Sequence, residues 1–303
     1  MAGIKMDLQQ PSGPLTSPVM SFLDHIKACN SGTVSGYHEF RVAGARVGWL
    51  RPALAQRLAV HRDVLTVTED VVELVPELDG FAARTAAVGR LLDALVADGV
   101  IPRKRGEHYP VLPTWGMPPL LSIDRAAVGP FGITAYGIHV NGMVRRSDGG
   151  LDLWIGRRSR DRSVAAGKLD NLIAGGQPVG LTLAENLVKE AYEEAAVGPE
   201  LAARAVPAGV VTYIMEAPAG LKVDGLFVYD LDLESDFVPR NTDGEVESFE
   251  RMPRQRVAEI VRDTDDFKFN CNLVIIDFLI RHGLIPPDHP DYLALTVGLR
   301  RWG

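Results

Sequence analysis

One segment of the chain constrains its fold more than any other: residues 175–197 read GGQPVGLTLAENLVKEAYEEAAV. Thr182 and Glu185 have the spacing of a capping box, in which both side chains satisfy free amides at a helix start, so a helix is predicted from here to Val197. Apolar residues then recur at helical spacing and form a stripe that must pack on a core, at Leu183, Leu187, Ala191 and Ala195.

Three carboxylates lie beside this stripe. Glu190, Glu193 and Glu194 stand at i, i+3 and i+4, so they project from one side of the helix, where like charges repel unless a cation gathers them. Mg²⁺ and Mn²⁺ suit such a cluster because both accept oxygen ligands. All three glutamates are predicted to be metal-binding and catalytic, with Glu193 acting as a ligand or as the base.

Glycines precede the helix. Gly175, Gly176 and Gly180 let the backbone turn tightly and approach a ligand closely, and amides near a helix start attract phosphate. A backbone carbonyl of Ala174 or Gly175 is expected to complete the metal shell, with Gly176 in a supporting role.

The segment resembles the Nudix box, a glycine, five residues, a glutamate, seven residues and then R-E-U-x-E-E-x-G-U, where U is aliphatic. Gly175, Glu190, Glu193, Glu194 and Val197 match it. Three positions depart from it: Leu181 replaces the first glutamate, Lys189 the arginine and Ala196 the glycine. The resemblance implies an α/β/α sandwich with a mixed sheet and a metal-dependent diphosphohydrolase. In the family, the first glutamate and the arginine belong to a polar network that supports the metal ligands. Lys189 is therefore predicted to support the glutamates as a cation. An active but altered site and a noncatalytic, ligand-binding Nudix protein both stay open.

Further blocks resemble one Nudix subfamily, which includes the Nudix domain fused to fungal thiamine pyrophosphokinase and plant homologues that act on damaged thiamine diphosphate. These blocks are residues 135–142, 154–159, 168–171, 228–231, 243–249 and 277–283. The resemblance implies cleavage of an oxidised thiamine diphosphate to the monophosphate, with Trp115 and Tyr136 as candidate walls for the ring. A nucleoside diphosphate derivative, such as ADP-ribose or an 8-oxo-nucleoside diphosphate, is the alternative substrate.

Other polar residues are candidates for the same site. Glu247 or Glu245, in a glycine-containing stretch, is predicted to supply a further acidic metal ligand. Contacts with the substrate are predicted for Arg157, Arg158, Lys168, Asp170 and Asn171, whereas His139, His282 and Cys271 are assigned structural roles.

The chain divides into three predicted parts. Residues 1–18, rich in Pro, Ser, Gly and Gln, are expected to form a mobile start. Residues 19–115 are predicted to be a small α+β domain that packs, dimerises or covers the substrate, and residues 116–303 the α/β Nudix domain. The proline-dense stretch from Tyr109 to Pro119 is interpreted as the linker.

Composition sets the remaining expectations. A formal net charge of −7 disfavours binding to nucleic acid. No apolar run reaches the length of a membrane span, and no signal segment is recognised at the N-terminus. Cys29 and Cys271 lack metal-ligand spacing and are expected to be reduced thiols in a cytoplasmic protein, with a small-molecule diphosphate as its partner.

Overall fold

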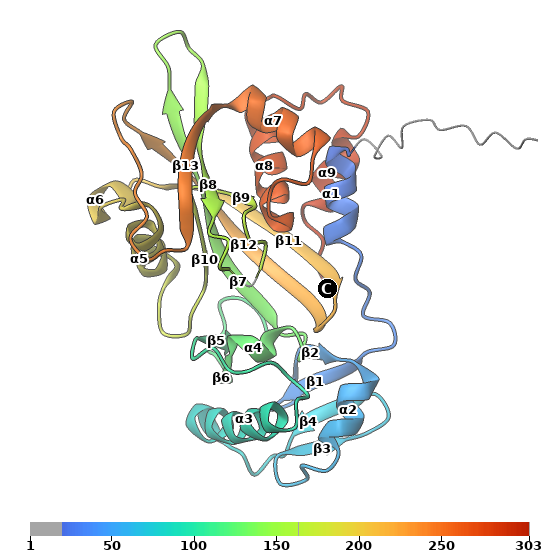
Figure 1. The fold of residues 1–303 in the computed structure, drawn as a ribbon. Coiled ribbons are helices and arrows are strands. Elements are labelled where there is room, and N and C mark those ends of the chain that lie inside the picture. The colour runs from blue at the N-terminus through green and yellow to red at the C-terminus, as the bar shows by residue number, and fades with distance from the viewer. Residues whose placement is uncertain (1–19, 163, 303) are drawn as a thin grey trace, which may run out of the picture.

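The structure is a computed structural model that describes residues 20–162 and 164–302. The predicted mobile start, residues 1–18, lies outside the described residues. The described chain forms two packed units, a larger one built on a seven-stranded sheet and a smaller one built on a four-stranded sheet (Figure 1).

The larger sheet is mixed. Its strand order is β11-β12-β7-β8-β13, with β10 added to β7 and β9 to β8, and β12 runs parallel to β7 while the other pairs are antiparallel. The strands are β7 (Thr134–Arg145), β8 (Leu151–Arg158), β9 (Leu169–Asp170), β10 (Ile173–Gly176), β11 (Val206–Ala217), β12 (Gly220–Leu233) and β13 (Val246–Pro253).

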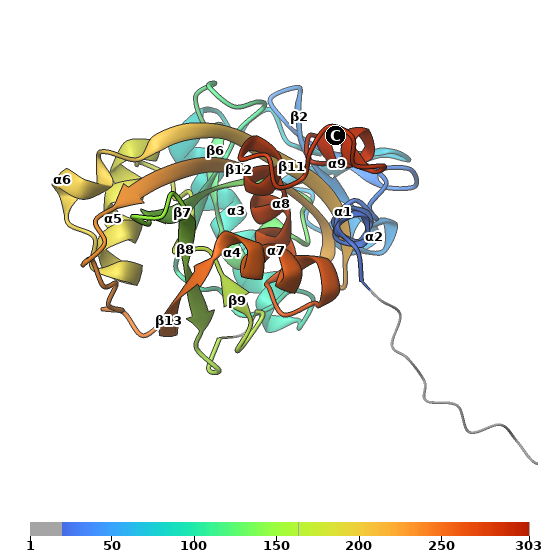
Figure 2. The same ribbon diagram turned by 90° about the horizontal axis from the view of Figure 1, so that it is seen from above.

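Helices cover this sheet on both faces (Figures 1 and 2). One face carries α5 (Leu183–Ala195) and α6 (Pro199–Ala202), and the other carries α1 (Phe22–Cys29), α7 (Arg254–Asp263), α8 (Phe269–Arg281) and α9 (Tyr292–Gly298). Alternate residues of β7 point to opposite faces: Ile138 and Val140 pack with α5, whereas Met143 packs with α8. The predicted α/β/α sandwich with a mixed sheet is confirmed.

The smaller unit combines a sheet of order β2-β1-β4-β3 with helices and a separate hairpin. Its elements are β1 (His38–Val42), β2 (Ala45–Leu50), α2 (Pro52–Leu58), β3 (Leu65–Val67), β4 (Val71–Leu74), α3 (Gly80–Ala97), β5 (His108–Val111), β6 (Leu121–Asp124) and α4 (Arg125–Val128). Ala43 and Gly44, both at positive φ, close the predicted β1–β2 hairpin.

The two hydrophobic cores do not follow the predicted domain boundaries at residues 19 and 115. Helix α1 buries Phe22 and Ile26 in the core of the larger unit, against α8 and α9. The stretch interpreted as a linker is the loop of the β5–β6 hairpin, both of whose strands belong to the smaller core, and Leu120 N donates to Val111 O at 2.9 Å. Prolines occur in this loop because its tip carries few ladder hydrogen bonds.

The two units touch along β2. Trp49 packs against Ile214, Leu221 and Val223 of the larger sheet, and the side chains of Tyr37 and Arg51 both bond to Glu216 at the end of β11. The β5–β6 hairpin lies at the end of the larger sheet that faces the smaller unit (Figure 1). Among the described residues, no helix is long and apolar enough to cross a membrane.

Candidate active site

Helix α5 has the predicted start. The Thr182 hydroxyl accepts from Glu185 N at 3.2 Å, and the Glu185 carboxylate accepts from Thr182 N at 2.8 Å. The helix ends at Ala196, whose φ of 54° is left-handed. This is the position at which the Nudix pattern has glycine, and glycine adopts that conformation without a steric penalty. Alanine therefore keeps the helix end at a cost of about 1 kcal/mol.

Glu190 and Glu194 are both directed at strand β10. A Cβ on Gly175 would lie 2.4 Å from Glu190 Cδ, so only glycine lets this carboxylate approach the strand. Glu194 is 5% exposed, and its Oε2 accepts from Ala174 N at 2.7 Å. Two carboxylates one helical turn apart therefore converge on one strand.

The carbonyl that faces them is that of Ala174. The amide and carbonyl of one strand residue point to the same side, and the Ala174 amide bonds to Glu194. Gln177 N donates to Tyr136 O of β7 at 2.8 Å. Because backbone groups two residues apart on a strand point the same way, the carbonyl of Gly175, which lies opposite Ile138, also points to β7. The predicted metal contact of Gly175 is thus replaced by a steric role.

Gly176 also has a steric role. A Cβ on Gly176 would lie 1.7 Å from the Tyr109 hydroxyl oxygen, so a residue of the smaller unit packs directly on the strand that faces the carboxylates. The Gly176 carbonyl accepts from Asn186 Nδ2 at 2.9 Å, which fixes β10 to α5. Gly176 therefore leaves room for Tyr109 of the smaller unit and accepts a hydrogen bond from Asn186 of α5.

The electrostatics of the pair call for a cation. Burial raises the pKa of Glu194 to about 8, reinforced by repulsion from Asp170, Glu190 and Glu245 and opposed by the Ala174 amide. Burial also raises the pKa of Glu190, although Lys189 opposes it. A buried and a half-buried carboxylate beside a backbone carbonyl form an all-oxygen donor set, which fits a hard divalent ion.

Lys189 and Glu193 occupy the outer edge of this cluster. Lys189 Nζ lies 3.0 Å from Glu190 Oε1 and 2.6 Å from Glu193 Oε2. The Glu193 side chain is 40% exposed and faces this lysine at the outer edge of the cluster, and its charge helps to raise the pKa of Glu190. Lys189 thus makes the supporting contact that was predicted for it.

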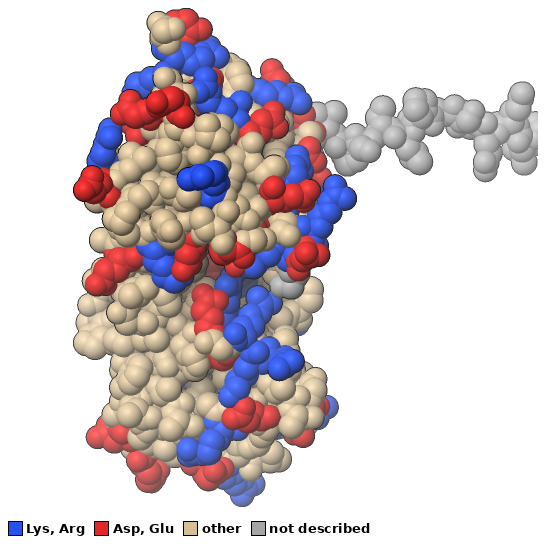
Figure 3. All heavy atoms as spheres, turned by 60° about the vertical axis from the view of Figure 1, so that its left-hand side comes forward, with Lys and Arg blue, Asp and Glu red and all other residues tan. Residues whose placement is uncertain are grey.

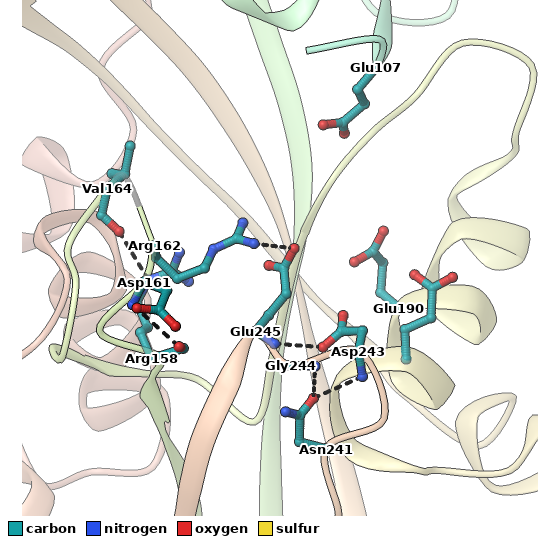
Figure 4. Close-up of polar contacts among 12 residues, drawn as sticks. Glu107, Arg158, Asp161, Arg162, Val164, Glu190, Asn241, Asp243, Gly244 and Glu245 are labelled. Carbon is teal, nitrogen blue, oxygen red and sulfur yellow. Dashed lines mark hydrogen bonds and ion pairs between the residues drawn. The ribbon is translucent and has the colours of Figure 1, made fainter.

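A loop between β12 and β13 adds Glu245. Asn241 Oδ1 accepts from the amides of Asp243 and Gly244, both at 3.1 Å, and Asp243 Oδ1 accepts from Glu245 N at 2.8 Å. Figure 4 shows Glu245 on this loop across from Glu190, and the Glu245 charge contributes to the raised pKa of Glu190. Of the two acids considered from the sequence, Glu245 is the one that joins the cluster.

Glu247 points elsewhere. Its partner is the highly exposed Arg160, at 3.8 Å, because a bulge between Val246 and Ser248 turns its side chain away. Glu245 instead pairs with Arg162 at 2.5 Å. Of the two candidate acids, the structure thus places Glu245 across from Glu190 and Glu247 beside Arg160.

Three predicted substrate contacts are buried in the protein interior. Arg158, Asp170 and Asn171 are each less than 9% exposed. Arg158 Nη1 lies 2.7 Å from Asp170 Oδ2, and Lys268 Nζ lies 3.5 Å from the same oxygen. Burial would raise the pKa of Asp170, but these cations hold it at about 2. These groups are buried and paired with one another, so in this structure they connect strands of the larger sheet with the start of α8.

The same network contains the residues assigned structural roles. The Cys271 thiol donates to Asp170 Oδ1 at 2.6 Å, and His139 Nδ1 lies 2.9 Å from Asn171 Oδ1. Asn171 Nδ2 continues the chain to Asn141 Oδ1 at 3.0 Å. Cys271 and Cys29 are both free and buried, as expected of reduced thiols.

The two other predicted contacts hold loops. Arg157 Nη1 donates to Gly167 O at 2.8 Å, and Lys168 Nζ donates to Asp265 O at 2.6 Å. Both side chains are tied to backbone that surrounds β9.

Residues of the smaller unit also lie near the carboxylate cluster, and they were not predicted from the sequence. Tyr109, Glu107 and Arg125 lie around the β5–β6 hairpin, and Glu107 reaches toward the space above Glu190 and Glu245 (Figure 4). Charged residues of both signs line the junction between the units (Figure 3). No motif marks these residues, because only the packing of two distant segments brings them to the site.

Comparison with known proteins identifies relatives of this chain. A family model described as a domain of unknown function (DUF4743) matches residues 21–135. Nudix hydrolase 24, chloroplastic, of Arabidopsis thaliana is 44% identical over 94% of this chain and 79% of its own. Nudix hydrolase 20, chloroplastic, of the same plant is 40% identical over the same shares.

Solved structures match a smaller part of the chain. The Nudix domain of Shewanella oneidensis NrtR, solved with ADP-ribose, aligns with 54% of this chain and 94% of its own, at 15% identity and a TM-score of 0.39.

The fold and the carboxylate cluster define a hydrolase of phosphoric anhydrides. The similarity to the two plant proteins, which extends over nearly the whole chain, identifies its family: the chain belongs to the Nudix hydrolases. Enzymes of this family need divalent metals in general.

Proposed function

We propose that the chain hydrolyses a small organic diphosphate at a centre held by Glu190 and Glu194, with Mg²⁺ or Mn²⁺ as the ion. The observation that carries the proposal is the convergence of these two carboxylates on β10, where Gly175 leaves room for Glu190 and the Ala174 amide binds Glu194. Such an ion neutralises phosphate charge and makes bound water more acidic.

The chain's own groups have distinct tasks in this proposal. Glu190, Glu194 and the Ala174 carbonyl would hold the ion, and Lys189 orients Glu190 from the outside. Glu245 approaches from the opposite loop, where Arg162 fixes its carboxylate, and it either completes the ligand set or accepts the proton of the attacking water. Glu193, predicted from the sequence to be a ligand or the base, lies at the outer edge of the cluster, paired with Lys189.

A damaged, oxidised thiamine diphosphate is the substrate that we propose, and its product is the monophosphate. Three rings lie beside the site: the Trp115 centroid is 4.6 Å from those of Tyr136 and Phe227. Trp115 and Met117 also line a pocket of about 280 Å³ with residues 177–181, directly after Gly176. An apolar, aromatic wall next to a diphosphate centre suits a planar organic ring.

The test is a panel of diphosphates with Mg²⁺ or Mn²⁺, read as release of phosphate or monophosphate. It includes thiamine diphosphate, its oxidised forms, ADP-ribose and 8-oxo-nucleoside diphosphates. Glu194→Gln is the matched control, because it keeps the shape but removes one ligand charge. A clear preference for a nucleotide would reject the thiamine assignment, and turnover that survives in Glu194→Gln would reject the metal centre. The predicted cytoplasmic location and homodimer are separate proposals, testable by cell fractionation and sedimentation.

A further inference from the structure

The smaller unit presents a rigid polar edge to the carboxylate cluster. Asp124 organises it: its carboxylate accepts from Arg105 N at 3.0 Å, Gly106 N at 2.8 Å and Ala126 N at 2.9 Å. These bonds tie the turn before β5 to the start of α4. Glu107 and Arg125, which flank the two bonded segments, are therefore held in fixed positions.

Arg125 lies over the contact between the two units. Its Nη1 is 2.7 Å from Glu107 Oε2, and its guanidinium carbon is 5.8 Å from the centre of the Tyr109 ring. The Tyr109 hydroxyl packs on Gly176, next to the strand residue against which Glu190 lies. A short path of contacts thus leads from the guanidinium to the proposed metal ligands.

The charges of the cluster reach Arg125. Burial lowers the pKa of Arg125, but Tyr109, Glu107 and Glu245 outweigh this effect and raise it overall. Glu190 is among the groups that raise the pKa of the Tyr109 hydroxyl, after burial itself. The guanidinium therefore faces the acids of the larger unit across the junction.

Arg125 differs from the two other cations around the site. Lys189 is bonded to Glu190 and Glu193, and Arg162 is bonded to Glu245, so both stabilise the acidic cluster itself. Arg125 forms its ion pair with Glu107, which is 36% exposed and lies outside the α5 cluster. This pair can be exchanged without disturbing the metal ligands.

The Arg125–Glu107 pair has little structural use. Both residues belong to the smaller unit, so the pair does not connect the units, and Arg125 N already donates to Glu107 O at 2.8 Å. The two side chains are 39% and 36% exposed, and ion pairs this accessible to solvent contribute little to stability. A guanidinium, by contrast, binds phosphate oxygens with two parallel hydrogen bonds.

We infer that Arg125 is the cation with which the smaller unit binds the diphosphate of the substrate, opposite the carboxylates of α5, and that a phosphate oxygen takes the place of Glu107. This inference rests on the proposed diphosphohydrolase function. It gives the smaller unit a direct part in substrate binding, since Arg125 and Tyr109 both belong to it.

The test measures binding separately from turnover. Titration calorimetry on the full chain would record the affinity for methylenediphosphonate, which is not hydrolysed, in the presence of Mg²⁺, and the affinity for Mn²⁺ alone. Arg125→Gln should weaken the diphosphonate by at least about tenfold, the effect of losing charge-assisted hydrogen bonds, and leave Mn²⁺ affinity unchanged. Arg125→Lys should fall between, because it keeps the charge and loses the fork.

Two further variants complete the design. Arg84→Gln is the matched control, since Arg84 also belongs to the smaller unit and pairs with an acid, Asp79, at 3.2 Å. Glu107→Gln should leave diphosphonate affinity unchanged or increase it, because it removes the competitor for Arg125. An Arg125→Gln protein that binds the diphosphonate as well as the wild type overturns the inference alone. A wild-type protein that neither binds nor hydrolyses any diphosphate overturns the proposed function with it.

Discussion

Replacing Gly175 by alanine tests the site at the point where it is built most tightly. The added Cβ would lie 2.4 Å from both Glu190 Cγ and Cδ. Since carbon atoms in contact settle near 3.5 Å, Glu190 must retreat by about 1 Å. A displacement of that size at a reacting centre costs on the order of 100-fold in rate. Gly175 is not at positive φ, so the backbone accepts alanine without strain.

The assay is kcat/KM on the diphosphate that the wild type hydrolyses best, together with Mn²⁺ affinity and the midpoint of thermal unfolding. We expect Gly175→Ala to lose about 100-fold in kcat/KM, to bind Mn²⁺ more weakly and to unfold near the wild-type temperature. Gly198→Ala is the control, because a Cβ there meets nothing within 4 Å. If Gly175→Ala keeps wild-type activity and Mn²⁺ affinity, Glu190 does not hold the ion against β10.

Four other perturbations address the remaining parts of the site. Mg²⁺ should raise the unfolding temperature more at pH 8 than at pH 6. The pKa of Glu194 is about 8 in the folded protein and 4.5 for the free carboxyl, so without metal the folded protein loses stability as the pH rises between these values. At pH 6 the ion must also displace the proton of Glu194, which weakens its binding. This dependence on pH should vanish in Glu194→Gln. Lys189→Met should lower kcat/KM about tenfold through the lost charged hydrogen bond to Glu190, and Lys189→Arg should lower it less, because it keeps the charge. Asp170→Asn should reduce the free energy of unfolding in urea by about 3–5 kcal/mol, since it leaves two buried cations unpaired; a loss below about 1 kcal/mol would contradict the buried-network assignment. Trp115→Ala should raise KM for a ring-bearing diphosphate several-fold, by the roughly 0.5–1.5 kcal/mol of an aromatic contact, and leave KM for pyrophosphate unchanged.

The sequence predicted those structural features that depend on interactions between residues close together in the chain. The capping box at Thr182, the apolar stripe of α5 and the hairpin at Ala43–Gly44 depend on neighbours within a few residues, and each is present in the structure. The convergence of Glu190 and Glu194 follows from helical spacing alone. The sequence was sufficient for these features because few conformations satisfy them.

Features that depend on distant packing were not predicted. Asp170 and Arg158 are charged, so their segment was predicted to be accessible to substrate. Their burial depends on distant packing, including the contact of Asp170 with Lys268 at the start of α8. Likewise, a one-residue bulge decides that Glu245 and not Glu247 faces the cluster. The proline-dense loop between β5 and β6 has the composition of a linker, and nothing local shows that its strands pair.

The departures from the Nudix pattern fit together in the structure. Leu181, in place of an acid, lines the pocket that contains Trp115, and its carbonyl accepts from Gln177 Nε2 at 2.6 Å. An arginine at position 189 would then lack the acid that its fork requires, whereas the ammonium of Lys189 serves Glu190 and Glu193 without a third partner. Losing one supporting ion pair thus leaves Lys189 in contact with Glu190, and Leu181 adds an apolar residue to the pocket that Trp115 lines. This arrangement supports the proposal of a substrate whose diphosphate carries a ring.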